Sequence, residues 1–182
     1  TQRRPVKAMI CGIPNVGKST FINSLLGKAS AKTGDKPGVT RGNQWITVNN
    51  EFILLDTPGV LWPKFDDETV GIHLALIGAI NDEIVNREEL AMRLIGELRI
   101  HYPSLLPERY GITEEELKER LSERGDMDVI GLDHESLCYL ELIAEKRKCI
   151  RKGGLPDYER AARLLIDDLR SGRLGRISLE RP

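Results

Sequence analysis

The sequence predicts an α/β domain built around a phosphate-binding loop, followed by an all-α domain. The motif Gly-x4-Gly-Lys-Ser at residues 12–19 lies between a strand pattern at 6–11 and a helix pattern at 20–26. From about residue 69 onward, apolar residues recur with helical spacing, and no later segment has a strand pattern. We therefore expect the nucleotide-binding part to span residues 1–68 and the helical domain to span residues 69–182.

The residue types in this loop are those that a phosphate site requires. Gly12 and Gly17 let the backbone approach the phosphates, so that successive N–H groups face an anion at the start of a helix. Lys18 is expected to reach the β- and γ-phosphates, and the Ser19 hydroxyl to ligate Mg²⁺. The expected nucleotide contacts in this loop are Gly12, Pro14, Asn15, Val16, Gly17, Lys18, Ser19 and Thr20.

Two strands are expected at residues 44–48 and 52–55, joined by a tight turn at Asn49-Asn50. The second strand is almost wholly apolar, as in a buried parallel sheet, and it ends in Asp56-Thr57-Pro58-Gly59. Asp56 is expected to hold Mg²⁺, usually through water, and the Gly59 N–H to bond the γ-phosphate.

The polar stretch at 27–42 is long enough to form a loop over a ligand. Its segment Pro37-Gly38-Val39-Thr40 contains our candidate sensor, Thr40, whose hydroxyl and N–H are expected to contact Mg²⁺ and the γ-phosphate. Thr33 and Thr47 are the alternatives.

The second half is expected to contain a short apolar segment and four helices. The apolar segment is residues 74–80, and the helices are residues 88–102, 113–124, 136–150 and 157–171. Thr113 and Glu116 form a capping-box pattern, Pro103 ends the helix before it, and Pro156 precedes the last helix.

The composition excludes several classes of protein. The three cysteines have no metal-binding or redox spacing, and no signal peptide or membrane-length apolar run is visible, so we expect a soluble intracellular protein. Residues 64–145 contain 8 Lys and Arg against 20 Asp and Glu, whereas residues 146–182 contain 11 against 5. The basic C-terminal part favours contact with phosphate or nucleic acid, although a solvated helix face explains such a bias equally well.

The segments GIPNVGKST, PGVT and DTPG resemble the first three motifs of translation-factor-class GTPases. The longer segments IPNVGKSTFINSL, AKTGDKPGVT and LLDTPGVLWPKF resemble the ribosome biogenesis GTPase A family, also called YlqF or RbgA. This family is circularly permuted, so its fourth and fifth motifs precede the phosphate loop. Because the chain has no Asn-Lys-x-Asp tetrapeptide, the resemblance implies an incomplete GTPase domain that is the C-terminal part of a longer protein. Guanine specificity rests on the resemblance alone.

The catalytic residues depart from those of Ras-like GTPases. Lys18, Thr40 and Gly59 are the expected catalytic contacts, but Val60 stands where Ras-like enzymes place a water-orienting glutamine. The resemblance implies help from a histidine of the upstream segment; His73 is expected to be a helix-surface or core residue. It also implies that Asn15 coordinates K⁺, which adds positive charge at the transferred phosphoryl group.

The resemblance implies a switch that binds GTP or GDP, acts on the precursor of the large ribosomal subunit and its rRNA, and has low intrinsic hydrolysis raised by K⁺ and by the ribosomal particle. Mg²⁺ and K⁺ are the expected ions, and the protein is expected to be cytoplasmic, monomeric and free of membrane contact. The RNA-binding candidates are Arg160, Arg163 and Arg170, on one face of the last helix. Two alternatives stay open: an RNA-binding assembly factor with a nucleotide-sensing, non-hydrolysing site, and a P-loop ATPase.

Overall fold

The computed structural model describes residues 4–27, 42–61, 64–81, 86–124 and 133–180. Its internal contacts divide the chain into a first unit, residues 1–83, and a second unit, residues 84–182. The boundary predicted from the sequence lies after residue 68. The helix that follows residue 68 is therefore grouped with the phosphate-binding part rather than with the helical part.

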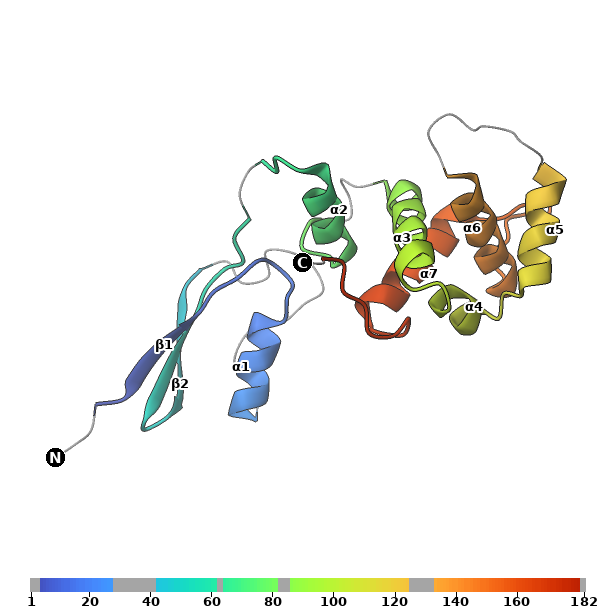
Figure 1. Cartoon of the computed structure of the whole chain (residues 1–182). Helices are drawn as coiled ribbons and strands as arrows, with labels where there is room; N and C mark the ends of the chain where they lie inside the picture. Colours follow the sequence, from blue (N-terminus) through green and yellow to red (C-terminus); the bar gives the residue numbers. More distant parts are fainter. Residues whose placement is uncertain (1–3, 28–41, 62–63, 82–85, 125–132, 181–182) are drawn as a thin grey trace. The chain divides into compact units, whose positions relative to one another are not determined.

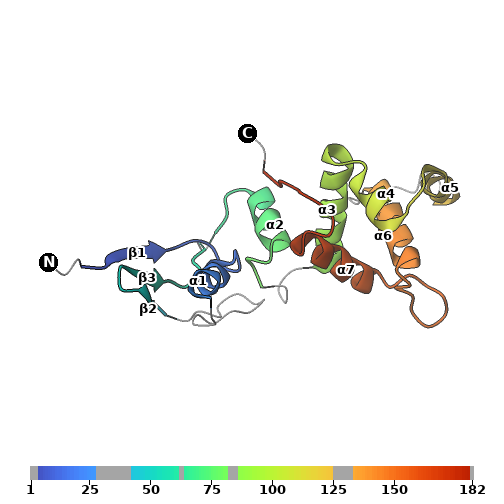
Figure 2. The same cartoon turned by 90° about the horizontal axis from the view of Figure 1, so that it is seen from below.

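The first unit contains a three-stranded sheet (Figure 1), with β1 (Val6–Ile10), β3 (Phe52–Asp56) and β2 (Gln44–Asn49) in that order, as labelled in Figure 2. The central strand β3 runs parallel to β1 and antiparallel to β2. Ile10 lies opposite Asp56 in the parallel pair, so the ends of both strands reach the same edge of the sheet. This is the edge at which an α/β sheet binds its ligand.

The turn between β2 and β3 lies one residue later than predicted. The turn residues are Asn50 and Glu51, and β2 extends through Asn49. The Asn49 side chain accepts a hydrogen bond from the Glu51 N–H at 2.8 Å, and the strand pairing is irregular between Thr47 and Asn49. This side-chain bond stabilises the turn from the strand end, which is a common role of asparagine.

Helix α1 (Lys18–Leu26) covers one face of the sheet. Its Ile22 is fully buried against Ile46 and Leu54, which point to the same face from adjacent strands. On the opposite face, Met9 and Trp45 flank Leu55 in one row and are 61% and 57% exposed. The apolar core around the sheet therefore lies between α1 and one of its faces.

Helix α2 (Glu68–Leu76) is capped at its N-terminus by Asp67, whose carboxylate accepts a hydrogen bond from the Thr69 N–H. The sequence predicted only an apolar segment at 74–80, because the first turn of α2 has few apolar residues. The helix ends in a turn at Gly78 (φ 77°), whose N–H donates to the Ala75 carbonyl.

The second unit consists of helices in which α3 packs against both α6 and α7, and α5 packs on α6 (Figures 1 and 2). The described helices are α3 (Arg87–His101), α4 (Leu105–Tyr110), α5 (Glu114–Arg124), α6 (His134–Lys146) and α7 (Tyr158–Arg170). Their core is aliphatic, and its fully buried side chains include Leu94, Ile95, Leu98, Ile143 and Leu165. The fold class predicted from the sequence, an α/β part followed by a helical part, is confirmed.

The N-termini of α5 and α7 lie where the sequence predicts them. The capping box at α5 is present: the Thr113 N–H donates to Glu116 Oε2 at 2.9 Å, and the Glu116 N–H donates to Thr113 Oγ1 at 3.2 Å. Asp157 caps α7 by accepting from the Arg160 N–H. The short helix α4 was not predicted, because Pro103 ends the preceding helix and Pro107 lies inside α4 itself.

Helix α6 ends four residues before the predicted end at Ile150. Lys148 has φ 55°, and the Cys149 N–H donates to the Ala144 carbonyl at 2.7 Å, which closes the helix end. A glycine at this position would have indicated the end, but lysine gives no such signal.

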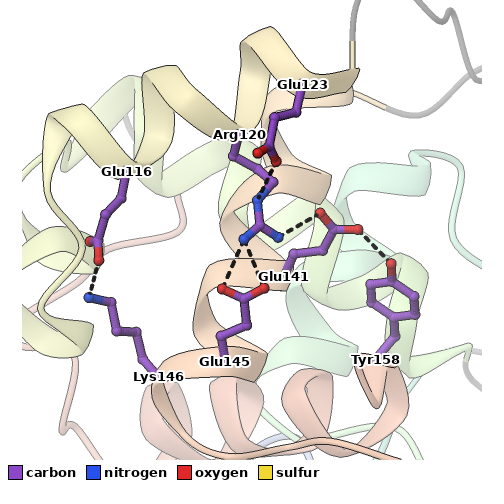
Figure 3. A network of polar contacts seen from close by, with 7 residues as sticks. All are labelled: Glu116, Arg120, Glu123, Glu141, Glu145, Lys146 and Tyr158. Atoms are coloured by element: carbon purple, nitrogen blue, oxygen red, sulfur yellow. Dashed lines mark hydrogen bonds and ion pairs between the residues drawn. The ribbon is translucent and has the colours of Figure 1, made fainter. Parts of the chain in front are cut away.

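Charged side chains attach α5 to α6 (Figure 3). Arg120 lies at the centre, bonded to Glu141 at 3.4 Å and to both oxygens of Glu145 at 2.8 and 2.9 Å. Glu141 also accepts from the Tyr158 hydroxyl at 2.6 Å, while Lys146 of α6 pairs with Glu116 at 2.5 Å. Because Glu141 is nearly buried, its pairing matters more than that of an exposed ion pair.

No helix among the described residues combines the length and the apolar character that crossing a bilayer requires.

Candidate phosphate-binding site

The loop between β1 and α1 forms a cradle at the edge of the sheet. Gly17 has φ 87°, a conformation that a residue with a side chain rarely adopts, and it directly precedes α1. The start of α1 has no side-chain cap and no acidic residue in its first turn. The first N–H groups of the helix and its positive dipole end are therefore suited to an anion such as a phosphate.

The Lys18 side chain lies over this loop. Its Nζ donates to the Ile13 carbonyl at 2.7 Å and to the Gly12 carbonyl at 3.1 Å. These bonds place the ammonium group beside the loop N–H groups, where it adds a full positive charge to their partial charges. The arrangement suits two adjacent phosphates, as the sequence predicts.

Ser19 and Asp56 meet across the site. The Ser19 hydroxyl donates to Asp56 Oδ2 at 3.2 Å, although the two residues lie on α1 and at the end of β3. Asp56 is 1% exposed, and its Oδ1 has no hydrogen-bond partner among the described residues. Since a buried carboxylate oxygen without a partner is costly, this pair fits a cation that also takes phosphate oxygens as ligands.

No group of three His, Cys, Asp or Glu side chains in the described part of the chain is arranged to hold a metal ion. Ser19 and Asp56 bring two oxygen ligands together. Mg²⁺ at this site would take its other ligands from water and the phosphates, as it usually does in nucleotide sites.

The segment after β3 packs directly against the phosphate loop. A Cβ atom built on Gly59 would lie 2.5 Å from the Pro14 N and Cα atoms, so only glycine fits there without movement. The Val60 N–H donates to the Gly12 carbonyl at 3.3 Å, and the Thr57 hydroxyl donates to the Ile10 carbonyl at 2.8 Å. These contacts hold the backbone of Asp56–Gly59 beside the cradle. The Val60 side chain is 70% exposed and has no group that orients water.

Asn15 connects the phosphate loop to the end of α2. Its Nδ2 donates to the Gly78 carbonyl at 2.9 Å, and its own φ is 57°. The bond fixes the orientation of the side-chain amide, which the predicted K⁺ role of Asn15 requires. No sequence signal indicated Gly78, because the contact joins residues 63 positions apart.

The structure thus brings together most of the predicted site: Gly12, Pro14, Asn15, Gly17, Lys18, Ser19, Asp56 and Gly59. Val16 and Thr20 belong to the same loop and helix start and are exposed. Thr40, with its alternative Thr33, lies outside the described residues, and Thr47 lies exposed on β2. The roles of these residues in catalysis and metal binding stay predictions.

His73 lies on α2, and its Nε2 is buried without a hydrogen-bond partner among the described residues. It is therefore partly in the core, one of the two placements that the sequence analysis expected. Arg160, Arg163 and Arg170 are exposed on α7, as predicted, in the second unit. Arg163 pairs with Glu159 at 3.6 Å.

The family described as 50S ribosome-binding GTPase matches residues 7–132 of the chain. Among curated proteins, Ribosome biogenesis GTPase A of Priestia megaterium is 45% identical over 98% of the chain, and that of Thermotoga maritima is 35% identical over the same share. The chain spans 56% and 58% of the lengths of these two relatives.

A solved structure described as GDP-bound YlqF has a TM-score of 0.58 and 30% identity to the chain. YlqF from T. maritima in a GNP-bound form has a TM-score of 0.56 and 29% identity. The two matches cover 99% and 98% of this chain, and they cover 62% and 60% of the respective solved chains. Since the family match extends over more than half of its residues and includes the phosphate loop and the Asp56–Gly59 segment, the chain belongs to the 50S ribosome-binding GTPase family.

Proposed function

We propose that the protein binds GTP with Mg²⁺, hydrolyses it, and acts as a switch in the assembly of the large ribosomal subunit. The observation that carries the proposal is the meeting of Lys18, Ser19 and Asp56 at one edge of the sheet. These groups match the β- and γ-phosphates and a hydrated divalent cation. Guanine as the base comes from similarity to Ribosome biogenesis GTPase A, because this chain has no Asn-Lys-x-Asp segment.

The chain's own residues contribute mainly charge stabilisation to hydrolysis. Lys18 and the loop N–H groups would balance charge on the transferred phosphoryl, while Ser19 and Asp56 would hold Mg²⁺, which neutralises the phosphate oxygens. The Gly59 N–H would contact the γ-phosphate, and so would Thr40. Since Val60 cannot orient water, we expect low intrinsic turnover that rises when the ribosomal particle is bound.

Asn15 would add K⁺ to this arrangement. Its amide is already oriented by the Gly78 carbonyl, so the oxygen can act as a ligand beside the phosphates. We expect turnover to be higher in K⁺ than in Na⁺, and Asn15→Ala to remove that difference. Equal rates of the unmodified protein in the two salts would contradict the K⁺ role.

The proposed partners are GTP or GDP and the precursor of the large subunit with its rRNA. We also propose that the protein is cytoplasmic and monomeric and has no membrane contact. Arg160, Arg163 and Arg170 of α7 stay RNA-binding candidates.

The test is GTP hydrolysis by the full-length protein in K⁺ buffer, with and without purified large subunits. The Lys18→Ala variant should lose the stimulated rate, whereas the matched variant Lys7→Ala should retain it, because Lys7 lies over the Trp45 ring rather than at the loop. Competition by ATP as strong as by GTP would favour a P-loop ATPase. Subunit binding without stimulated hydrolysis would favour the other alternative, a nucleotide sensor, with which the exposed Val60 is also compatible.

A further inference from the structure

The connection between α6 and α7 is an ordered hairpin with a basic tip. Backbone interactions close it: the Arg151 N–H donates to the Leu155 carbonyl at 2.8 Å, the Asp157 N–H donates to the Cys149 carbonyl at 2.8 Å, and Ile150 pairs with Pro156. Gly153 and Gly154 lie at its tip, and Cys149 anchors its base in the core. We call residues 146–156 the basic hairpin.

The basic hairpin concentrates positive charge. Residues 146–152 include five Lys and Arg and no acidic residue. Three of these cations have partners: Lys146 pairs with Glu116, Arg147 lies over the Tyr110 ring, and Arg151 pairs with Asp157. Lys148 and Lys152 are exposed and have no partner in the part of the chain that the structure describes.

Lys148 also adopts a backbone conformation that lysine disfavours. It has φ 55°, at a helix end where glycine would carry no steric cost. The other non-glycine residue at positive φ in the described ranges is Asn15, in the phosphate loop. Strained residues of this kind concentrate at functional positions, which makes Lys148 a candidate for a functional contact.

Helix α7 is less suited to contact a polyanion than the basic hairpin is. Asp168 is buried and pairs with Arg109 and Arg173. The exposed face of the helix therefore carries three arginines against Glu159 and Asp167. Arg163 already pairs with Glu159. The attraction of a phosphate backbone depends on uncompensated cations, and the hairpin has a larger excess of them than α7.

We propose that the basic hairpin binds the phosphate backbone of rRNA, with Lys148 and Lys152 as its main contacts. This rests on the proposed function, and it moves the principal contact from α7 to the hairpin. Lysine is a mobile point charge that suits phosphates without demanding a fixed partner geometry. No aromatic residue lies in residues 146–156, so the contact is independent of base sequence.

The test measures binding of the full-length protein to a fluorescein-labelled double-stranded RNA hairpin of arbitrary sequence over a series of KCl concentrations. Lys148→Asn combined with Lys152→Gln should lower the slope of log affinity against log salt by about 2, one for each lost phosphate contact. Asparagine tolerates the backbone of residue 148, which protects the fold. The matched control is Lys7→Gln with Lys118→Gln, which removes the same number of positive charges outside the proposed RNA contacts and should change the slope little. If the variant with both lysine substitutions unfolds at a lower temperature than the unmodified protein, Lys152→Gln alone should lower the slope by about 1.

An unchanged slope in the hairpin variants would overturn the proposal. Loss of binding to large subunits with unchanged binding to the RNA would also overturn it, because the hairpin would then contact a protein. Basal GTP hydrolysis of the hairpin variants should equal that of the unmodified protein. If the unmodified protein itself neither binds large subunits nor hydrolyses GTP, the proposed function fails; if it does both and the hairpin variants match it, only the hairpin proposal fails.

Discussion

Asp56 combines deep burial with a carboxylate oxygen that has no partner among the described residues, so it links stability to ligand binding. Asp56→Asn removes a charge that is costly to bury, and we expect the free energy of unfolding without Mg²⁺ to rise by about 1 kcal/mol. The same change should weaken Mg²⁺-dependent nucleotide binding at least about tenfold, which corresponds to about 1.4 kcal/mol. Urea denaturation and nucleotide titration measure the two effects.

The exposed residue Asp66 provides the control for Asp56. Asp66→Asn should change neither quantity. Nucleotide affinity of Asp56→Asn that equals that of the unmodified protein, in the presence of Mg²⁺, would show that this carboxylate does not hold the ion.

Residue 59 must be glycine because a larger side chain would collide with Pro14, and not because of its φ angle. Gly59→Ala places a methyl group 2.5 Å from the Pro14 backbone, so the Asp56–Gly59 segment or the loop must move. We expect affinity for GTP to fall more than affinity for GDP, because the Gly59 N–H is proposed to contact the γ-phosphate. Gly42→Ala is the control, since no atom of the described residues lies within 4 Å of its added Cβ. Equal losses for the two nucleotides would argue against a γ-phosphate contact.

Asp168 makes the second unit sensitive to acid. Burial by itself would raise its pKa, but hydrogen bonds from Arg109, Arg173 and Tyr110 together hold the pKa below its usual value. Because the pKa is lower in the folded state, the stabilisation is complete above the pKa of the unfolded state, near pH 4. It is lost as the pH falls through the lower pKa of the folded state.

Asp168→Asn should therefore lower the free energy of unfolding by about 2 to 4 kcal/mol at pH 7. The difference from the unmodified protein should shrink as the pH falls below about 4. Urea denaturation at several pH values measures this, with Asp167→Asn, its exposed neighbour on α7, as the control. A difference that stays constant down to pH 3 would contradict the account.

At the scale of elements, the attachment of α5 depends on Arg120. Its side chain is 22% exposed, and its partner Glu141 is 5% exposed, so Arg120→Ala removes a cationic partner from a nearly buried carboxylate. We expect a loss of about 2 to 3 kcal/mol in the free energy of unfolding. Lys118→Ala, which breaks an exposed pair with Glu114 on the same helix, should cost less than about 0.5 kcal/mol. Similar losses for the two variants would show that the network contributes no more than surface pairs.

Most elements could be predicted from local patterns, and the misses have local reasons. The strands, α1, α3, α5 and α7 follow apolar periodicity and capping residues, which act over a few positions. The predicted end of α6 was wrong because Lys148 adopts a backbone conformation that is usual for glycine and rare for lysine. Helix α4 was missed because two prolines bracket its start, and α2 was placed too late because its first turn is polar.

At the scale of the whole molecule, the phosphate site could be predicted because its chemistry lies in two short motifs. The meeting of Ser19 with Asp56 follows once β1 and β3 are parallel neighbours. Contacts without a motif could not be predicted: the bond from Asn15 to Gly78, and the network around Arg120. Both join residues distant in sequence, and only the packed structure brings them together.

The central claim is that the nucleotide controls binding to the ribosomal particle. The most direct measurement is the affinity of the full-length protein for purified large subunits, with a non-hydrolysable GTP analogue and with GDP, in K⁺ and Mg²⁺. The account predicts at least about tenfold tighter binding with the analogue, a coupling of about 1.4 kcal/mol, and loss of the difference in Lys18→Ala. Equal affinity in the two nucleotide states would contradict it, because a ligand that does not discriminate between two states cannot switch them.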